Sequence, residues 1–182
     1  MTLAEQTELA DPGPDGMDLL DGCHRRTALA LDQLAAMVSR LSEQGADAET
    51  RRLARQVHEF FSTTVRQHHD DEERHVFPRM LASGDAALMQ TVLRLQTDHN
   101  WLEEDWLNLS PQLLAVAEGH VGYEVEALRE WSEVFIGLLR DHMALEESVI
   151  YPQARAKLGE RERHDIGRQI ASRRRGLADA RK

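Results

Sequence analysis

One pattern occurs twice in this chain. His68 to Pro78 reads HHDDEERHVFP, and His142 to Pro152 reads HMALEESVIYP. Both copies follow the scheme His-x-x-x-Glu-Glu-x-x-x-aromatic-Pro. In a helix, residues i and i+4 lie one turn apart on the same face, so each copy presents a histidine beside a glutamate. The aromatic-Pro ending is expected to kink or end each helix beyond that pair.

The composition favours helices around this repeat. Hydrophobic residues make up 41% of the 182 residues, but aromatic residues only 5%, and Leu and Ala dominate the apolar set. Such a set suits helices better than a β-sandwich. Proline is rare after Pro14, so long helices can form. The length is that of one domain.

Apolar residues recur at helical spacing over four long stretches, namely residues 17–43, 49–81, 85–117 and 122–157. Glycines separate the stretches: Gly45, Gly84, Gly119 and Gly122. This pattern predicts an all-α fold, an antiparallel up-down-up-down four-helix bundle over residues 17–157. A disordered N-terminal arm is expected over residues 1–16 and a basic C-terminal helix or tail over residues 158–182.

Each of the four helical stripes contains one histidine: His24, His68, His99 and His142. The midpoints between consecutive histidines are positions 46, 83.5 and 120.5, and each lies at one of the glycine breaks. Equal numbers of residues on the two sides of a turn give equal rise, at about 1.5 Å per residue. Antiparallel packing therefore brings the four histidines to one level.

Three of these histidines are followed four residues later by a glutamate: Glu72, Glu103 and Glu146. Burying one such group without a partner costs about 2–7 kcal/mol, and far more for a bare carboxylate. Either a structural polar network or bound cations must compensate. Imidazole and carboxylate without thiolate suit iron, with manganese or zinc as alternatives. Seven ligands exceed the needs of one metal, so two carboxylate-bridged ions fit better. The order differs from the Glu-x-x-His of ferritin-like bundles.

The chain resembles the hemerythrin-like family of HHE cation-binding domains. The resemblance rests on CHRR around His24, on both copies of the repeat, and on DHNWLEEDW around His99. It covers residues 17–157 and implies a four-helix bundle with a non-haem di-iron centre near one end.

The resemblance also implies roles for single residues. Glu72 and Glu146 would bridge the two irons, His24 and His68 would bind one iron, and His99, Glu103 and His142 would bind the other. The iron of His24 and His68 has fewer terminal ligands, so it is the expected open site. The family's oxygen carriers have a histidine at the place of Glu103, and this difference argues for redox chemistry or sensing over simple oxygen carriage.

Other polar residues near the motifs receive secondary assignments. His69 lies about 100° from the stripe and is expected at the surface. His75 returns to the interior face, as a core histidine, a donor to a ligand or an alternative ligand. Glu73 and Glu147 are expected to pair with surface arginines, or to replace a ligand if the register is shifted by one. Cys23 is expected to pack against a neighbour rather than to sense redox state.

Charge and targeting signals limit the partners. The N-terminus has no secretory signal, no apolar run is long enough to span a bilayer, and the single cysteine excludes an internal disulfide. The expected location is cytoplasmic. The net charge of −10 argues against a nucleic-acid partner. The basic segment Arg173–Arg175 is interpreted as part of a solvated last helix, with an anionic partner as the alternative.

These features predict a metal-binding protein that binds O2 or reacts with peroxide or NO. A non-enzymatic iron or oxygen sensor and a metal-storage protein are the alternatives. No P-loop, nucleophile triad or dinucleotide fingerprint is present in the sequence.

Overall fold

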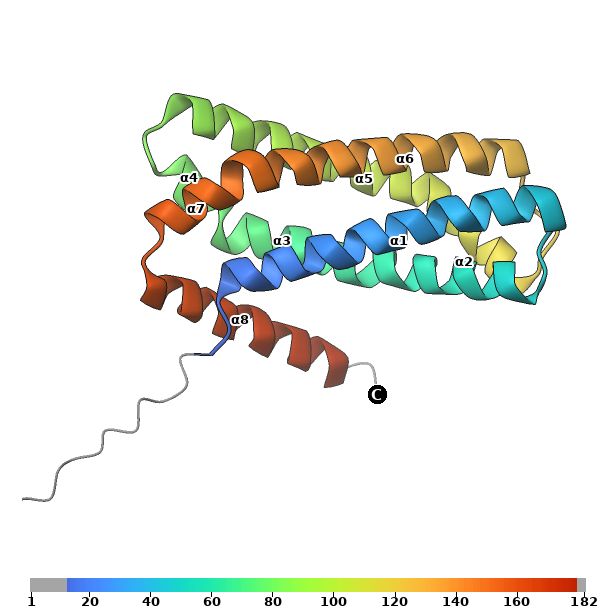
Figure 1. The fold of residues 1–182 in the computed structure, drawn as a ribbon, viewed down its shortest axis with the longest axis horizontal. Coiled ribbons are helices and arrows are strands. Elements are labelled where there is room, and N and C mark those ends of the chain that lie inside the picture. The colour runs from blue at the N-terminus through green and yellow to red at the C-terminus, as the bar shows by residue number, and fades with distance from the viewer. Residues whose placement is uncertain (1–12, 180–182) are drawn as a thin grey trace, which may run out of the picture.

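The computed structural model describes residues 13–179, and every regular element in this part of the chain is a helix (Figure 1). The predicted all-α class is therefore confirmed. Most of the predicted N-terminal arm, residues 1–12, lies outside the described residues. Within residues 13–179, no helix combines the length and the apolar character needed to cross a bilayer.

The described chain contains four long helical rods, two of them interrupted by a π-helical turn, and a final separate helix. The rods are α1 (Gly16–Gln44); α2 (Ala48–Phe60), η1 (Phe61–Val65) and α3 (Arg66–His75), with α4 (Phe77–Leu81) after a break; α5 (Ala86–Glu118); and α6 (Val125–Leu145), η2 (Glu146–Ile150) and α7 (Tyr151–Lys157). The last helix is α8 (Glu160–Asp179).

The four rods lie side by side, and the chain turns back after each of the first three (Figure 1). Rod α1 packs against α2 and α6, and α5 packs against the same two helices. Gly45 and Gly119 end α1 and α5 with positive φ angles of 72° and 77°, a conformation that favours glycine. Asp47 begins the second rod and accepts a hydrogen bond from the backbone N–H of Thr50. The predicted breaks thus have a local structural cause.

The apolar core consists of two clusters. One cluster occupies the half of the bundle near Gly45 and Gly119 and includes Leu34, Phe61, Trp106, Leu113 and Phe135. The other occupies the opposite end and includes Met17, Leu20, Phe77, Leu95 and Tyr151. A layer of buried polar side chains separates the two clusters along the rods. This arrangement keeps bulk water away from the polar layer on both sides.

Helix α8 packs along α1 and α3 at the end that carries the second cluster (Figure 1). Ile166 and Ile170 are buried in that cluster. A Cβ at Gly167 would lie 1.9 Å from the carbonyl oxygen of Pro14, so only glycine permits this close approach.

The arginines of α8 bind the second rod. Arg173 and Arg174 both donate to the fully buried carboxylate of Asp71, the latter at 3.0 Å. The interpretation of this basic segment as a solvated helix face is therefore wrong for these two arginines. Arg175 is exposed, as expected.

Candidate metal centre

The buried polar layer contains six of the seven ligands predicted from the sequence. These six residues are all buried, with at most 8% of their surface exposed: His24, His68, Glu72, His99, His142 and Glu146. They come from all four rods, and the two glutamates come from the two copies of the repeat. Counting residues from the turns therefore predicted the level of the four histidines correctly.

One group in this layer consists of His24, His68, Glu72 and Glu146, whose potential ligand atoms all lie within 4.8 Å of one another. His24 Nε2 is 3.2 Å from Glu146 Oε2. His68 Nε2 is 3.5 Å from Glu72 Oε1.

A second group consists of His99 and His142 with the same two glutamates. The two histidine Nε2 atoms are 3.1 Å apart. His142 Nε2 is 3.2 Å from Glu146 Oε1, and His99 Nε2 is 3.7 Å from Glu72 Oε2. Each carboxylate thus has one oxygen near each group of histidines.

His69 forms a further group with His99 and His142 alone, contrary to the expectation of a surface position. Its ligand atom clusters with those of His99 and His142. The ring stacks on His99 with centroids 4.0 Å apart and an interplanar angle of 16°. Its Nε2 atom is buried without a hydrogen-bond partner. A residue about 100° from the stripe faces the seam between α3 and α5, because a helix in a bundle has two inner neighbours.

Glu103 does not join either group. Its side chain is 53% exposed and pairs with Arg66 at the surface. The buried stripe of α5 runs through His99, Leu102 and Trp106, at intervals of three and four residues. Glu103 lies one position beyond this stripe and points outward. The negative charge that the sequence analysis expected beside the metals at this position is therefore absent from the layer.

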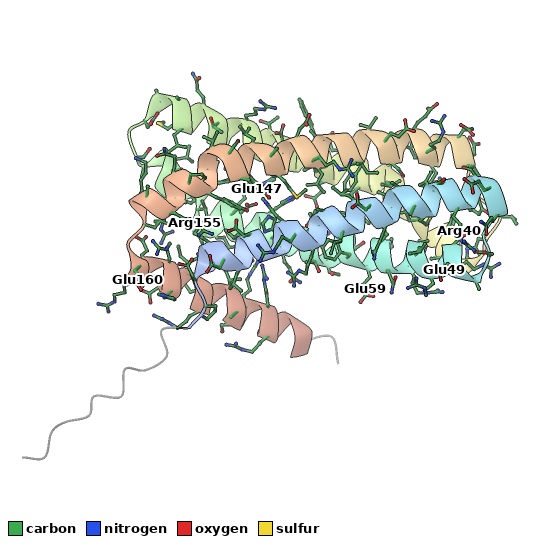
Figure 2. All side chains as sticks on the ribbon, viewed as in Figure 1. Arg40, Glu49, Glu59, Glu147, Arg155 and Glu160 are labelled. Carbon is green, nitrogen blue, oxygen red and sulfur yellow. The ribbon has the colours of Figure 1, made fainter. Side chains whose placement is uncertain are left out.

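The second glutamate of each repeat holds a histidine of a neighbouring rod. His24 donates its Nδ1–H to Glu147 at 2.9 Å, and His99 donates to Glu73 at 3.0 Å. Figure 2 labels Glu147 on the segment that runs beside α1. The predicted pairing of these glutamates with surface arginines is wrong. A carboxylate on the outer nitrogen fixes the tautomer and leaves the Nε2 lone pair directed into the layer.

In each copy of the repeat, the aromatic residue stacks on the histidine that is bound by the second glutamate of that copy. Phe77 stacks on His99 with centroids 5.5 Å apart, and Tyr151 stacks on His24 at 5.0 Å. Tyr151 also donates its hydroxyl to Glu72 Oε1 at 2.6 Å, with the oxygen 3.0 Å from His24 Nε2. A straight helix would turn Tyr151 about 140° away from Glu146. The π-helical turn η2 accommodates the extra residue and keeps Tyr151 facing inward.

The two glutamates have opposite pKa shifts. Burial and the charge of Glu146 raise the pKa of Glu72 well above its usual value, although the hydrogen bond from Tyr151 opposes this. Burial also tends to raise the pKa of Glu146. The nearby charges of His142 and His24 outweigh burial and hold the pKa of Glu146 well below its usual value.

The histidines of the layer also differ in the direction of their pKa shifts. Burial and the charge of His24 lower the pKa of His68 well below its usual value. Burial acts on His142 in the same direction, but Glu146 and Asp98 outweigh it and raise the pKa of His142 to about 9. His142 Nδ1 is 3.8 Å from Asp98 Oδ2.

Many buried ligand atoms have no hydrogen-bond partner of ordinary geometry. They are both ring nitrogens of His68, Nε2 of His69, Nδ1 of His142, Oε2 of Glu72 and both carboxylate oxygens of Glu146. Buried polar atoms in folded proteins are normally satisfied, and unpaired charges are costly. Cations in the layer would satisfy most of these atoms, so the residues fit a metal centre. The absence of thiolate among them fits iron, manganese or zinc.

His75 and Cys23 remain outside both groups. His75 is half-buried, and burial lowers its pKa. Cys23 is fully buried on α1, and burial raises the pKa of its thiol, so it packs as a small apolar residue.

Fold and site together fit a helical cation-binding protein, with buried imidazole and carboxylate groups between its rods. Residues 15–154 match the hemerythrin HHE cation-binding domain, and the chain belongs to that family. The chain is also similar to an uncharacterized protein of Haemophilus influenzae, with 27% identity over 160 residues that span 87% of this chain and 89% of the relative. The family and the buried histidine–glutamate layer support cation binding as the role of the site.

Proposed function

We propose that this protein is a di-iron protein of the up-down-up-down type expected for its family. Glu72 and Glu146 would bridge the two ions, with manganese or zinc as alternatives to iron. The division of each carboxylate's oxygens between two groups of histidines carries this proposal. One ion would be held by His24 and His68, and the other by His69, His99 and His142.

When bound, iron would supply a redox centre for small ligands such as O2, peroxide or NO. The chain's own residues prepare the site for such a ligand. The two apolar clusters exclude water from the layer. Glu73 and Glu147 orient the histidines of α5 and α1 through their outer nitrogens. Tyr151 holds a proton on its phenol oxygen, at 2.6 Å from Glu72.

We infer a side of ligand entry other than the one that the sequence analysis expected. The sequence analysis placed the open position beside His24 and His68. A side cavity in the described structure touches His69 and His99 and none of the residues of the first histidine pair. We therefore infer that small ligands reach the centre from the His69 side.

Metal analysis tests the proposal directly. Protein purified from iron-supplied cells is expected to hold about two ions, since two groups of ligands share two carboxylates. Its visible spectrum should change on addition of peroxide or NO. A yield well under one ion after careful reconstitution would contradict the proposal.

A second candidate function, an iron or oxygen sensor, is favoured by the contact of α8 with the ligand-bearing rod. Arg173 and Arg174 bind Asp71, which directly precedes Glu72. Loss of metal from Glu72 could therefore weaken the docking of α8. Pull-down with and without iron tests this function, and an identical set of bound proteins in both states would contradict it.

A further inference from the structure

A cavity of about 540 Å3 opens on the side of the bundle between η1–α3 and α5. O2, peroxide and NO need only a small part of this volume. Cavities of roughly 300–1,000 Å3 are typical of sites for organic small molecules. The size of the cavity therefore points to an organic ligand in addition to the small oxidant.

The inner wall of the cavity is apolar and aromatic. Phe61, Trp106 and Phe135 line it, with ring centroids 5.2–5.6 Å apart. Leu102 and Leu139 complete this wall. A flat aromatic molecule would match such a surface in shape and polarity.

The rim of the cavity is rich in hydrogen-bond acceptors. It contains the carboxylates of Asp70, Glu73 and Glu103, of which Asp70 is paired with Arg173 and Glu103 with Arg66. A carboxylate offers about four acceptor positions, so each of the three retains capacity beyond its present partner. This rim favours neutral molecules with hydroxyl donors.

The cavity also reaches the candidate metal ligands. His69 and His99 form part of its lining, and their rings stack at 4.0 Å. A molecule in the cavity would therefore lie against the histidines of the second group. No residue of the first histidine pair lines the cavity.

We propose that this cavity binds a neutral hydroxylated aromatic reductant of the hydroquinone class, which supplies electrons to the metal centre. The proposal rests on the proposed di-iron function. Hydroquinone loses two electrons and two protons and becomes quinone. The two electrons reduce one hydrogen peroxide, which takes up two protons and becomes two waters. No further oxidant or reductant is needed.

Binding is measured on the zinc-loaded full chain, because zinc cannot oxidise the probe. Hydroquinone is titrated without oxygen and followed by calorimetry, with 1,4-dimethoxybenzene as the counterpart that lacks hydroxyl donors. Saturable binding of hydroquinone is expected, with the counterpart weaker by about tenfold because it cannot donate hydrogen bonds to the carboxylates of the rim.

Two variants narrow the cavity, and one serves as a control. Asn100→Trp and Thr63→Trp each add an indole at the lining. Asn108→Trp adds the same group on α5 at an exposed position outside it. The first two should weaken hydroquinone binding by about tenfold or more, while the control leaves it unchanged. Circular dichroism and zinc content establish that each variant is folded and loaded.

Absence of saturable binding, or equal weakening by Asn108→Trp, would overturn the proposal. So would equal affinity for 1,4-dimethoxybenzene. These outcomes are separable from failure of the proposed function. Zinc-loaded protein that binds hydroquinone in the cavity supports the site even if the iron-loaded protein is inert toward peroxide. Iron-loaded protein that consumes peroxide without any hydroquinone binding refutes the site alone.

Discussion

The two copies of the repeat build the two halves of the centre from the same parts, yet the halves differ. Each copy supplies an inward histidine and an inward glutamate. Each copy also supplies a second glutamate and an aromatic ring, and these two side chains contact a histidine of a neighbouring rod. The first copy has His69 where the second has Met143, and it ends on Phe77 where the second ends on Tyr151. A symmetric scaffold therefore carries two unequal halves.

The unequal positions decide what each half can do. In the half with His24, Tyr151 fills the space beside the histidine and donates to Glu72. In the half with His99, the equivalent ring has no hydroxyl, and His69 adds a third imidazole beside the side cavity. One half is thus closed and holds a proton, and the other half is accessible.

The largest effect is expected from removing one inward histidine in each half. If the proposed centre is correct, His68→Ala and His142→Ala should each lose at least about one metal ion, because each variant removes an imidazole ligand of one ion. Helicity should largely survive, since the cluster near Gly45 and Gly119 is distant from the layer. Metal analysis and circular dichroism measure both. His120→Ala, an exposed histidine, is the control. Full metal retention in both variants would refute the ligand assignment.

A sharper test separates His69 from Glu103. His69→Leu should weaken metal binding in the His99 half by about 10- to 100-fold, which is the loss typical of changing a residue that supports the ligands of a metal. Glu103→Gln should leave metal binding unchanged, because its side chain pairs with Arg66 at the surface. Competitive titration with a chelator measures both affinities. The reverse order of effects would restore Glu103 as a ligand.

Tyr151→Phe makes the second copy of the repeat resemble the first. It removes the hydrogen bond to Glu72 Oε1, and an unsatisfied buried acceptor costs about 1–3 kcal/mol. The metal-free protein should lose stability by this amount in denaturant unfolding. Tyr123→Phe, in the loop between α5 and α6, serves as the control. Equal stability of the two variants would show that the phenol contributes only packing.

The raised pKa of His142 predicts that metal binding in the half with His99 depends on pH. The pKa of His142 is raised to about 9, so at neutral pH a metal ion must displace its proton. The pKa of His68 is lowered, so His68 is already neutral there. The metal affinity of the half with His99 should rise by about tenfold per pH unit up to about pH 9, because one proton is displaced from His142. Zinc calorimetry at several pH values tests this. An affinity of this half that does not change between about pH 7 and pH 9 would contradict the raised pKa of His142.

The smallest effects are expected at the outer glutamates. Glu73→Gln and Glu147→Gln each weaken the hold on a histidine tautomer, with a loss of metal affinity of about tenfold or less. Glu147 is 55% exposed and Glu73 is 34% exposed, so water replaces Glu147 more readily. The Glu147 variant should therefore have the smaller effect. A larger loss of metal affinity for Glu147→Gln than for Glu73→Gln would contradict this argument from exposure.

The sequence by itself determined the helical class, the helix breaks and the level of the polar layer. Glycines at positive φ end two of the rods, and the rise of a helix is constant, so counting residues from the turns places His24, His68, His99 and His142 together. The i, i+4 spacing likewise placed Glu72 and Glu146 on the inward faces. These features depend on local geometry, which the sequence contains.

Only the tertiary structure decided what lies beside the stripe. His69 faces inward because its ring stacks on His99 of α5, and Glu103 lies at the surface, where it pairs with Arg66 of α3. Tyr151 reaches Glu72 because a π-helical turn accommodates one extra residue. Arg173 and Arg174 find Asp71 from about a hundred positions away in the chain. Such contacts depend on the packing of elements distant in sequence, and helical periodicity carries no information about those neighbours.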